Sequence, residues 1–117
     1  MITKGKLSFG DIVWTEFDPS IGHEYQNKRP AIVIQSDKQL RETNLVTIIP
    51  LTSQKDNCMP DDILIAACKE NNLMRDSLAK VYCITSFDYA RFDKVIGKIN
   101  KETIIKIKDY LKKHFDI

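Results

Sequence analysis

Residues 10–34 read GDIVWTEFDPSIGHEYQNKRPAIVI, and they predict a strand, a polar loop and a second strand. Residues 12–17 are rich in β-branched and aromatic side chains, which favour strands. Residues 31–34 form an apolar run short enough for a strand buried on both faces. Between them, turn-forming residues at 18–22 bend the chain. This segment therefore predicts a β fold with a polar loop between its first two strands.

Further strands are expected along the chain, with one helix at its end. The pattern predicts strands at 45–49 (stopped by Pro50), 63–67, 77–85 and 94–99, with a loop at 53–61. Asn100 is expected to cap a helix whose apolar residues recur at spacings of three and four, namely Ile104, Ile107, Leu111 and Phe115. The opposite face carries Lys101, Lys106, Lys112 and Lys113 and is expected to be solvated. The fold class is therefore α+β, mainly β: a small, bent antiparallel sheet or barrel with a C-terminal helix.

Composition limits the partners. The 117 residues form one domain, 1–117, with 43% hydrophobic and 29% charged residues. The net charge of +2 excludes a basic tail, so a nucleic-acid site would consist of a few cations in a groove. No apolar run is long enough for a membrane span, and the N-terminus lacks the apolar core of a signal peptide, so we expect a cytoplasmic protein.

The cysteines and histidines do not predict a zinc site. Cys58, Cys68 and Cys83 contain no C-x-x-C pair, and the only histidines, His23 and His114, lie far apart in sequence. We expect reduced, partly buried cysteines and neither a metal nor another cofactor.

Arg29 is the first candidate for chemistry. The following Pro30 restricts its backbone to an extended conformation, and a guanidinium can donate two parallel hydrogen bonds to phosphate oxygens. The alternative is a surface ion pair with Glu24 or Asp18. His23 and Glu24 lie in the preceding polar segment, and a histidine exchanges protons near neutral pH.

Two further candidates follow in the chain. Thr52 and Ser53 place hydroxyls where a strand ends, although such hydroxyls usually tie a turn. Lys80 is a cation among apolar neighbours in the predicted strand 77–85, and the alternative is that it points to solvent.

Residues 10–14, 18–19, 22–24 and 29–34 together resemble the signature of the MazF/PemK toxins, the ribonuclease components of bacterial toxin–antitoxin pairs. The resemblance continues at 49–53, 76–77 and 96–99. It implies an SH3-like, PemK-type barrel, a homodimer and a cognate antitoxin, with DNA contacted only through the antitoxin complex and no membrane partner. It also implies metal-independent cleavage of single-stranded RNA, in which the 2′-hydroxyl attacks its phosphate and leaves 2′,3′-cyclic phosphate and 5′-hydroxyl ends.

The resemblance also assigns roles. Arg29 would be the catalytic cation, Thr52 its polar partner, His23 the proton carrier and Lys80 an auxiliary cation. The residues expected to contact RNA are Glu24, Tyr25, Gln26, Ser53, Gln54 and Tyr82.

The chain departs from the family pattern in one segment. Tyr82, Cys83 and Thr85 replace an acidic residue, a glutamine and an arginine, and Lys80 replaces the arginine of PemK-type members. Tyr25 and Tyr82 are expected either to stack on bases or to pack in the core. These departures keep open a non-catalytic module that binds RNA or protein. A gyrase poison of related fold is disfavoured by the loop at 22–29.

Overall fold

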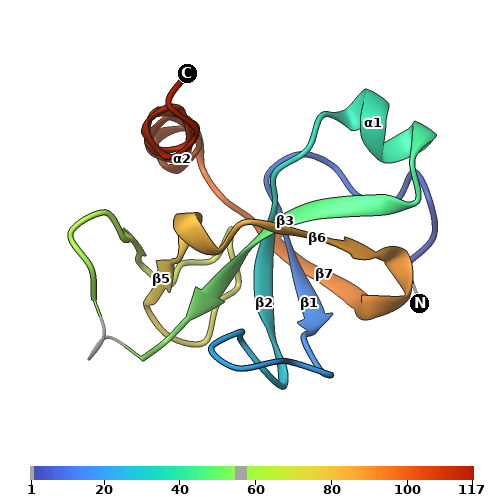
Figure 1. The fold of residues 1–117 in the computed structure, drawn as a ribbon, viewed down its shortest axis with the longest axis horizontal. Helices are drawn as coiled ribbons and strands as arrows, with labels where there is room; N and C mark the ends of the chain where they lie inside the picture. The colour runs from blue at the N-terminus through green and yellow to red at the C-terminus, as the bar shows by residue number, and fades with distance from the viewer. Residues whose placement is uncertain (1, 55–57) are drawn as a thin grey trace.

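The computed structural model describes residues 2–54 and 58–117 (Figure 1). Its strands are β1 (Asp11–Glu16), β2 (Lys28–Val33), β3 (Leu45–Thr52), β4 (Ile63–Ile65), β5 (Ser77–Ala79), β6 (Thr85–Asp88) and β7 (Phe92–Lys98). Its helices are α1 (Asp37–Glu42) and α2 (Lys101–Phe115), with short 3-10 turns η1 (Val81–Cys83) and η2 (Tyr89–Arg91). None of the helices within these described ranges is long and apolar enough to cross a membrane.

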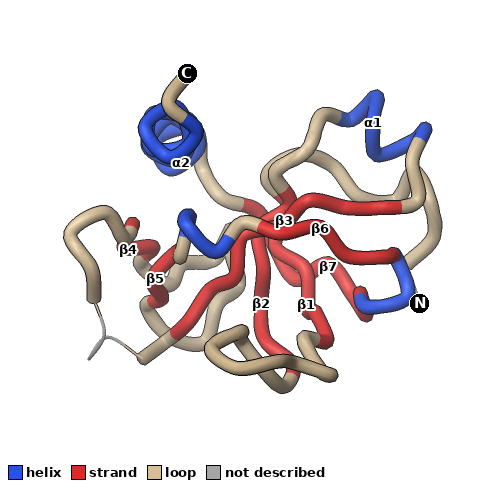
Figure 2. Tube along the Cα trace, viewed as in Figure 1, coloured by secondary structure: helices blue, strands red, loops and turns tan. Residues whose placement is uncertain are grey.

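All the strand pairs are antiparallel, and they form one bent sheet in the order β4-β5-β3-β2-β1-β7 (Figure 2). The sixth strand pairs with β3 outside this path, so β3 contacts β2 along one edge and both β5 and β6 along the other. The expected class, a mainly antiparallel β fold with a C-terminal helix, is confirmed.

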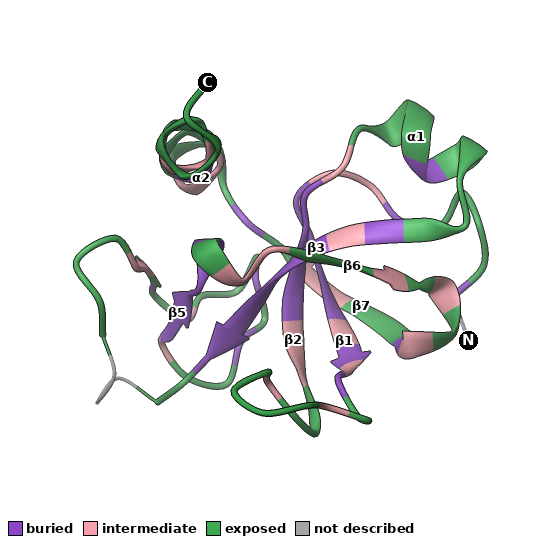
Figure 3. Cartoon of the chain, viewed as in Figure 1, coloured by how far each residue is buried: buried purple, intermediate pink, exposed green. Residues whose placement is uncertain are grey.

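The core has two parts, one on each face of the central strands. Figure 3 shows that β1, β2 and β3 each carry buried stretches. Alternation along β1 sends Ile12 into one part and Val13 into the other, because successive strand residues face opposite sides. Ile107 of α2 packs into the first part and Leu40 of α1 into the second, and both side chains are fully buried. The two helices therefore cover opposite faces of the sheet.

The helix predicted at the end of the chain is present. The Asn100 side chain accepts a hydrogen bond from the Thr103 amide at 2.8 Å, as expected of a cap. Ile107 is buried and Ile104 half-buried, while Phe115 is exposed at the end of the helix.

The prediction that Pro50 stops its strand is wrong. Pro50 lies inside β3 and pairs with Ala31 of β2. Its carbonyl accepts from the Lys80 amide at 3.0 Å on the other edge. In an antiparallel strand the nitrogen and the carbonyl of one residue face the same edge, so the Pro50 nitrogen faces the edge shared by β5 and β6. At Pro50, β3 has ended its pairing with β6 and has not yet begun its pairing with β5. No strand-to-strand hydrogen bond therefore requires an N–H group at Pro50.

The predicted strand at 77–85 is also wrong as a continuous element. Between the pairs Leu51–Ala79 and Ile48–Thr85, β3 advances three residues (51 to 48) while its partner advances six (79 to 85). The three surplus residues form η1, which lets one segment pair twice with the same edge of β3. The strand at 63–67 ends earlier, at Ile65, and the helix α1 was not predicted. Cys58 and Cys68 are exposed, so only Cys83 is partly buried as expected.

Candidate functional site

The loop between β1 and β2 holds several of the predicted site residues. The Phe17 amide donates to the Asn27 carbonyl at 3.0 Å and closes the base of the loop. Asn27 adopts a φ of 65°, a left-handed conformation that asparagine tolerates better than most residues. Within the loop, Glu24 accepts from the Ile21 amide at 2.8 Å. The loop is therefore held at its base and by one internal carboxylate bond.

Arg29 is held by this loop rather than by an acidic side chain. Its Nε and Nη2 atoms donate to the Gln26 carbonyl at 3.2 and 3.1 Å, and its guanidinium lies 4.6 Å from the centre of the Tyr25 ring. These contacts replace the alternative ion pair with Glu24 or Asp18. Burial lowers the pKa of Arg29, while the negative charge of an ionised Tyr25 would oppose that change, and an arginine remains protonated at neutral pH. A partly desolvated cation is thus fixed beside the sheet.

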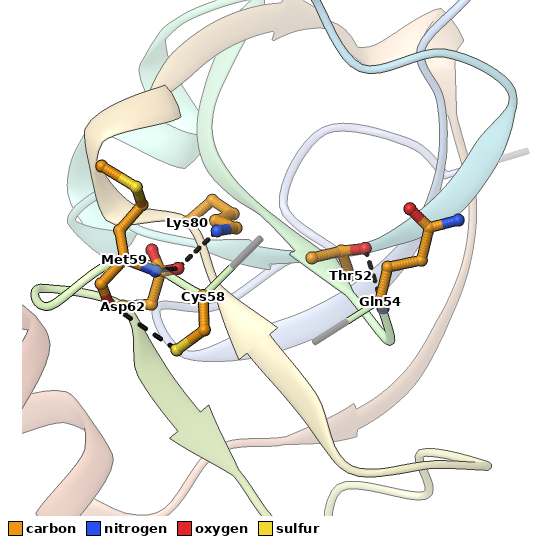
Figure 4. Close-up of polar contacts among 6 residues, drawn as sticks. All are labelled: Thr52, Gln54, Cys58, Met59, Asp62 and Lys80. Carbon is orange, nitrogen blue, oxygen red and sulfur yellow. Dashed lines mark hydrogen bonds and ion pairs between the residues drawn. The ribbon is translucent and has the colours of Figure 1, made fainter. Parts of the chain in front are cut away.

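Thr52 lies at the matching position of the neighbouring strand. Ala31 of β2 pairs with Pro50 of β3, and continuing this register by two residues sets Thr52 opposite Arg29. Thr52 is 8% exposed, and its Oγ1 accepts from the Gln54 amide at 3.2 Å (Figure 4). The hydroxyl therefore ties the turn, as the alternative expected, yet it also lines a groove with Arg29.

This first groove, which we call the sheet-end groove, has a volume of about 770 Å³. Arg29, Thr52, Ser53 and Gln54 all line it, so the structure brings four of the predicted residues together. Among the residues that the structure describes, its charged lining residues are Lys28, Arg29, Arg75, Lys94 and Asp93, four cations against one carboxylate. A protein of net charge +2 thus concentrates positive charge in one groove.

One wall of the sheet-end groove is the loop at 66–76. The Asn71 side chain holds this loop, because its Oδ1 accepts from the amides of Cys68 and Leu73, both at 3.0 Å, and its Nδ2 donates to the Ala66 carbonyl at 2.8 Å. The loop lies directly against Gly97 of β7, where an added Cβ would come within 2.3 Å of the Asn71 carbonyl oxygen. Only a glycine allows this approach.

We therefore expect Gly97→Ala to lower the free energy of unfolding by about 1–3 kcal/mol, the usual cost of forcing an extra methyl group into packed structure. The clash would displace the backbone at Asn71, in the loop that forms one wall of the sheet-end groove. The loss of stability should therefore be accompanied by weaker binding of any ligand in that groove. Urea denaturation measures the first effect. Gly5→Ala is the comparison, since no atom lies within 4 Å of its Cβ position, although its positive φ adds backbone strain. Equal stability of the Gly97 variant and the wild type would contradict the tight contact.

A second groove, which we call the loop groove, has a volume of about 460 Å³ and contains the Tyr25 ring on which Arg29 stacks. His23, Glu24 and Tyr25 line it, together with Thr85 of β6. His23 and Glu24 are exposed, and Tyr25 is half-buried. His23 and Thr52 therefore line different grooves. Arg29 contacts both grooves, because it lines the sheet-end groove and stacks on the Tyr25 ring of the loop groove.

Three aromatic rings line the loop groove, and we call them the aromatic row. Tyr25 lies edge-to-face with Phe17, with centroids 6.4 Å apart, and Phe17 with Phe87 at 5.3 Å. Arg29 covers Tyr25 at one end, and Arg91 covers Phe87 at 4.4 Å at the other. Arg91 could not be predicted from the sequence, because no local motif relates it to a loop more than 70 residues earlier.

Lys80 lies in neither groove. It is 2% exposed and forms an ion pair with Asp62, whose side chain is 1% exposed (Figure 4). Burial acts to lower the pKa of Lys80, but the hydrogen bond and negative charge of Asp62 outweigh it, so the pKa is raised above 10.5. The alternative that Lys80 points to solvent is wrong.

The remaining predicted residues lie near this pair or in the loop. Tyr82 is 46% exposed and has the Lys80 ammonium 5.9 Å from its ring centre, so it does not pack in the core. Burial raises the pKa of the Tyr25 hydroxyl. The buried part of the Tyr82 side chain has the same effect on the pKa of its hydroxyl. Gln26 is exposed and offers its carbonyl to Arg29.

Comparison with known proteins places this arrangement in a family. Residues 8–115 match the model of the PemK-like, MazF-like toxins of type II toxin–antitoxin systems. Endoribonuclease MazF9 of Mycobacterium tuberculosis is 29% identical over 113 residues, covering 92% of this chain and 95% of the relative. The endoribonuclease toxin MazF of Escherichia coli K12 is 32% identical over 54 residues, covering 46% and 49%.

Solved structures agree on the fold. The crystal structure of MazF from Deinococcus radiodurans superposes with a TM-score of 0.82 at 21% identity, over 95% of this chain and 97% of that one. A mycobacterial endoribonuclease in complex with its cognate antitoxin superposes with a TM-score of 0.72 at 13% identity, over 95% and 94%. The resemblance inferred from the sequence is confirmed, and the chain belongs to the PemK-like, MazF-like toxins of type II toxin–antitoxin systems.

Proposed function

We propose that this toxin is an endoribonuclease that cuts single-stranded RNA without a metal ion. The observation that carries the proposal is the sheet-end groove, which is lined both by the fixed guanidinium of Arg29 and by Thr52 at the end of its strand, among an excess of cations. Such a groove attracts the phosphates of a nucleic acid, and an arginine matches the geometry of phosphate oxygens. Its curated relatives carry the name endoribonuclease.

In the proposed reaction the ribose 2′-oxygen forms a bond to the adjacent phosphorus, and the bond from phosphorus to the 5′-oxygen breaks. The 2′-hydroxyl gives up its proton and the leaving 5′-oxygen receives one, so the products are a 2′,3′-cyclic phosphate and a 5′-hydroxyl. Arg29 stabilises the charge that develops on the phosphorane oxygens, and Thr52 donates its hydroxyl hydrogen to one of them.

His23 is the proposed proton carrier, reaching the scissile phosphate from the loop groove. Lys80 is too buried to contact RNA, so its proposed role is to position the segment that carries Tyr82 and Cys83. Ser53, Gln54, Glu24, Tyr25, Gln26 and Tyr82 are proposed to contact the RNA around the reacting phosphate.

The proposal includes protein partners. A mycobacterial relative is described in complex with its cognate antitoxin, and we propose a cognate antitoxin for this chain as well. An acidic antitoxin segment would complement the four cations of the sheet-end groove and exclude RNA from it. We further propose a homodimer that acts in the cytoplasm and meets DNA only through the antitoxin.

The test uses a long single-stranded RNA incubated with purified toxin in excess EDTA. Discrete cuts with cyclic-phosphate ends are expected. A substrate with a 2′-deoxy sugar on the 5′ side of one mapped cut should resist cleavage there, because the nucleophile is missing. Cleavage of the deoxy substrate, or cleavage that EDTA abolishes, would contradict the proposed chemistry.

A second candidate is a binding module without cleavage, favoured by the Cys83 and Thr85 side chains in the loop groove, where the family pattern has polar and cationic groups. RNA retained in a mobility shift but left uncut across many sequences would support the module instead.

A further inference from the structure

We propose that the loop groove is a slot for one nucleobase and that Arg91 reads guanine in it. The proposal rests on the proposed function, because it assigns the base that the same toxin selects in its RNA. The feature that carries it is the aromatic row of Tyr25, Phe17 and Phe87, which ends in a guanidinium on each side.

Arg91 is fixed and has donors left over. Its Nη1 atom donates to the carbonyls of Glu16 and Asp18, at 3.2 and 3.1 Å, which uses both hydrogens of that nitrogen. Its plane lies over the Phe87 ring at 4.4 Å. No bond within the described part of the chain uses its Nε and Nη2 hydrogens, so three N–H donors remain on a side chain that lines the loop groove.

The loop groove suits a base better than a phosphate. Its charged side chains are Arg91, Glu24 and, when protonated, His23, which is close to balance, whereas the sheet-end groove has four cations to one carboxylate. Its lining is about equally polar and apolar, and the partly exposed rings of Tyr25 and Phe87 supply the aromatic surface, whereas Phe17 behind them is buried. Single-stranded RNA is commonly held by stacking bases on aromatic rings.

The donor arrangement favours guanine. An arginine edge with two parallel N–H groups matches the N7 and O6 acceptors of guanine, whereas adenine offers an acceptor at N7 beside a donor at N6. Arg29 contacts both grooves, so a strand whose phosphate lies on Arg29 can place a neighbouring base on the aromatic row. In this proposal Arg91 selects the base and Arg29 binds the phosphate.

The test measures binding without cleavage. The probes are 2′-O-methyl RNA tetranucleotides that differ at one position at a time, and they cannot be cut because their 2′-oxygen is blocked. The wild type is expected to prefer guanine at one position by about tenfold, the scale of one bidentate contact. Replacing that guanine by 7-deazaguanine, which lacks the N7 acceptor, should remove most of the preference.

Arg91→Gln is expected to abolish the preference for guanine over the other bases, whatever its effect on the overall affinity, and deazaguanine should then have no further effect. Arg41→Gln, on the exposed face of α1, is the matched control and should behave as the wild type. A preference that survives Arg91→Gln, or no preference in the wild type, would overturn the proposal. Equal weakening of all probes by Arg91→Gln would also overturn it, by showing that Arg91 only supports the loop. Cleavage of ordinary RNA by the same proteins would leave the proposed function standing, whereas failure of every probe to bind together with a lack of cleavage of ordinary RNA would overturn both.

Discussion

Replacing Arg29 by alanine is expected to lower the RNA cleavage rate by 10²–10³-fold or more, which is the cost of removing one preorganised donor from a charged transition state. The protein should stay folded, because Arg29 bonds only to a loop carbonyl and stacks on a half-buried tyrosine. Single-turnover cleavage of a mapped RNA site measures the effect, and growth of expressing cells should recover in parallel.

Two variants show whether the effect belongs to the guanidinium. Arg29→Lys keeps a charge but loses the paired donors, so its rate should fall between those of alanine and wild type. Lys28→Ala removes a neighbouring cation of the same groove and should weaken binding without a comparable loss of rate. A folded Arg29→Ala protein with the wild-type rate would remove Arg29 from the chemistry.

Breaking the Lys80–Asp62 pair is expected to have the largest effect on stability. Lys80→Ala leaves a buried carboxylate without its main counter-charge, and such losses cost about 3–5 kcal/mol. The double replacement Lys80→Met with Asp62→Leu should recover most of this, since it leaves no unpaired buried charge. Denaturant unfolding of the single variants Lys80→Met and Asp62→Leu and of the double variant gives the coupling energy.

The pair also predicts a pH dependence. The pKa of Lys80 is raised in the folded protein, so its stabilising contribution is fully present below 10.5 and falls as the pH rises through the folded-state pKa. The double variant should lack this alkaline loss. Wild-type stability in Lys80→Ala would show that the ion pair contributes nothing to folding.

Local patterns predicted the parts of the fold that depend on local rules. The spacing of Ile104, Ile107 and Leu111 with a capping Asn100 is sufficient for α2, because the signal lies within the helix itself. The strands β1 and β2 were predicted for the same reason. The pairing of Arg29 with Thr52 came from the family resemblance, and the register of β2 on β3 gives it a physical basis.

Features that depend on distant partners were not predictable. Pro50 is tolerated in β3 only because the strand changes partner at that residue, and η1 exists only because β5 and β6 share one edge of β3. Arg91 contributes through carbonyls of a loop more than 70 residues away. The sequence around Lys80 does not indicate that it is buried, because its partner Asp62 lies in a separate segment of the chain.

The position of β7 at the end of the sheet order has a consequence for synthesis of the toxin. β1 is made first among the strands, but one of its two edges is covered only by β7, at Phe92–Lys98. A ribosome-bound chain that stops short of β7 exposes that edge and lacks part of the sheet-end groove, to which Asp93, Lys94 and Ile96 contribute. A nascent chain that already contains β1, β2 and β3 therefore cannot form the complete sheet-end groove until β7 has been added and has paired with β1.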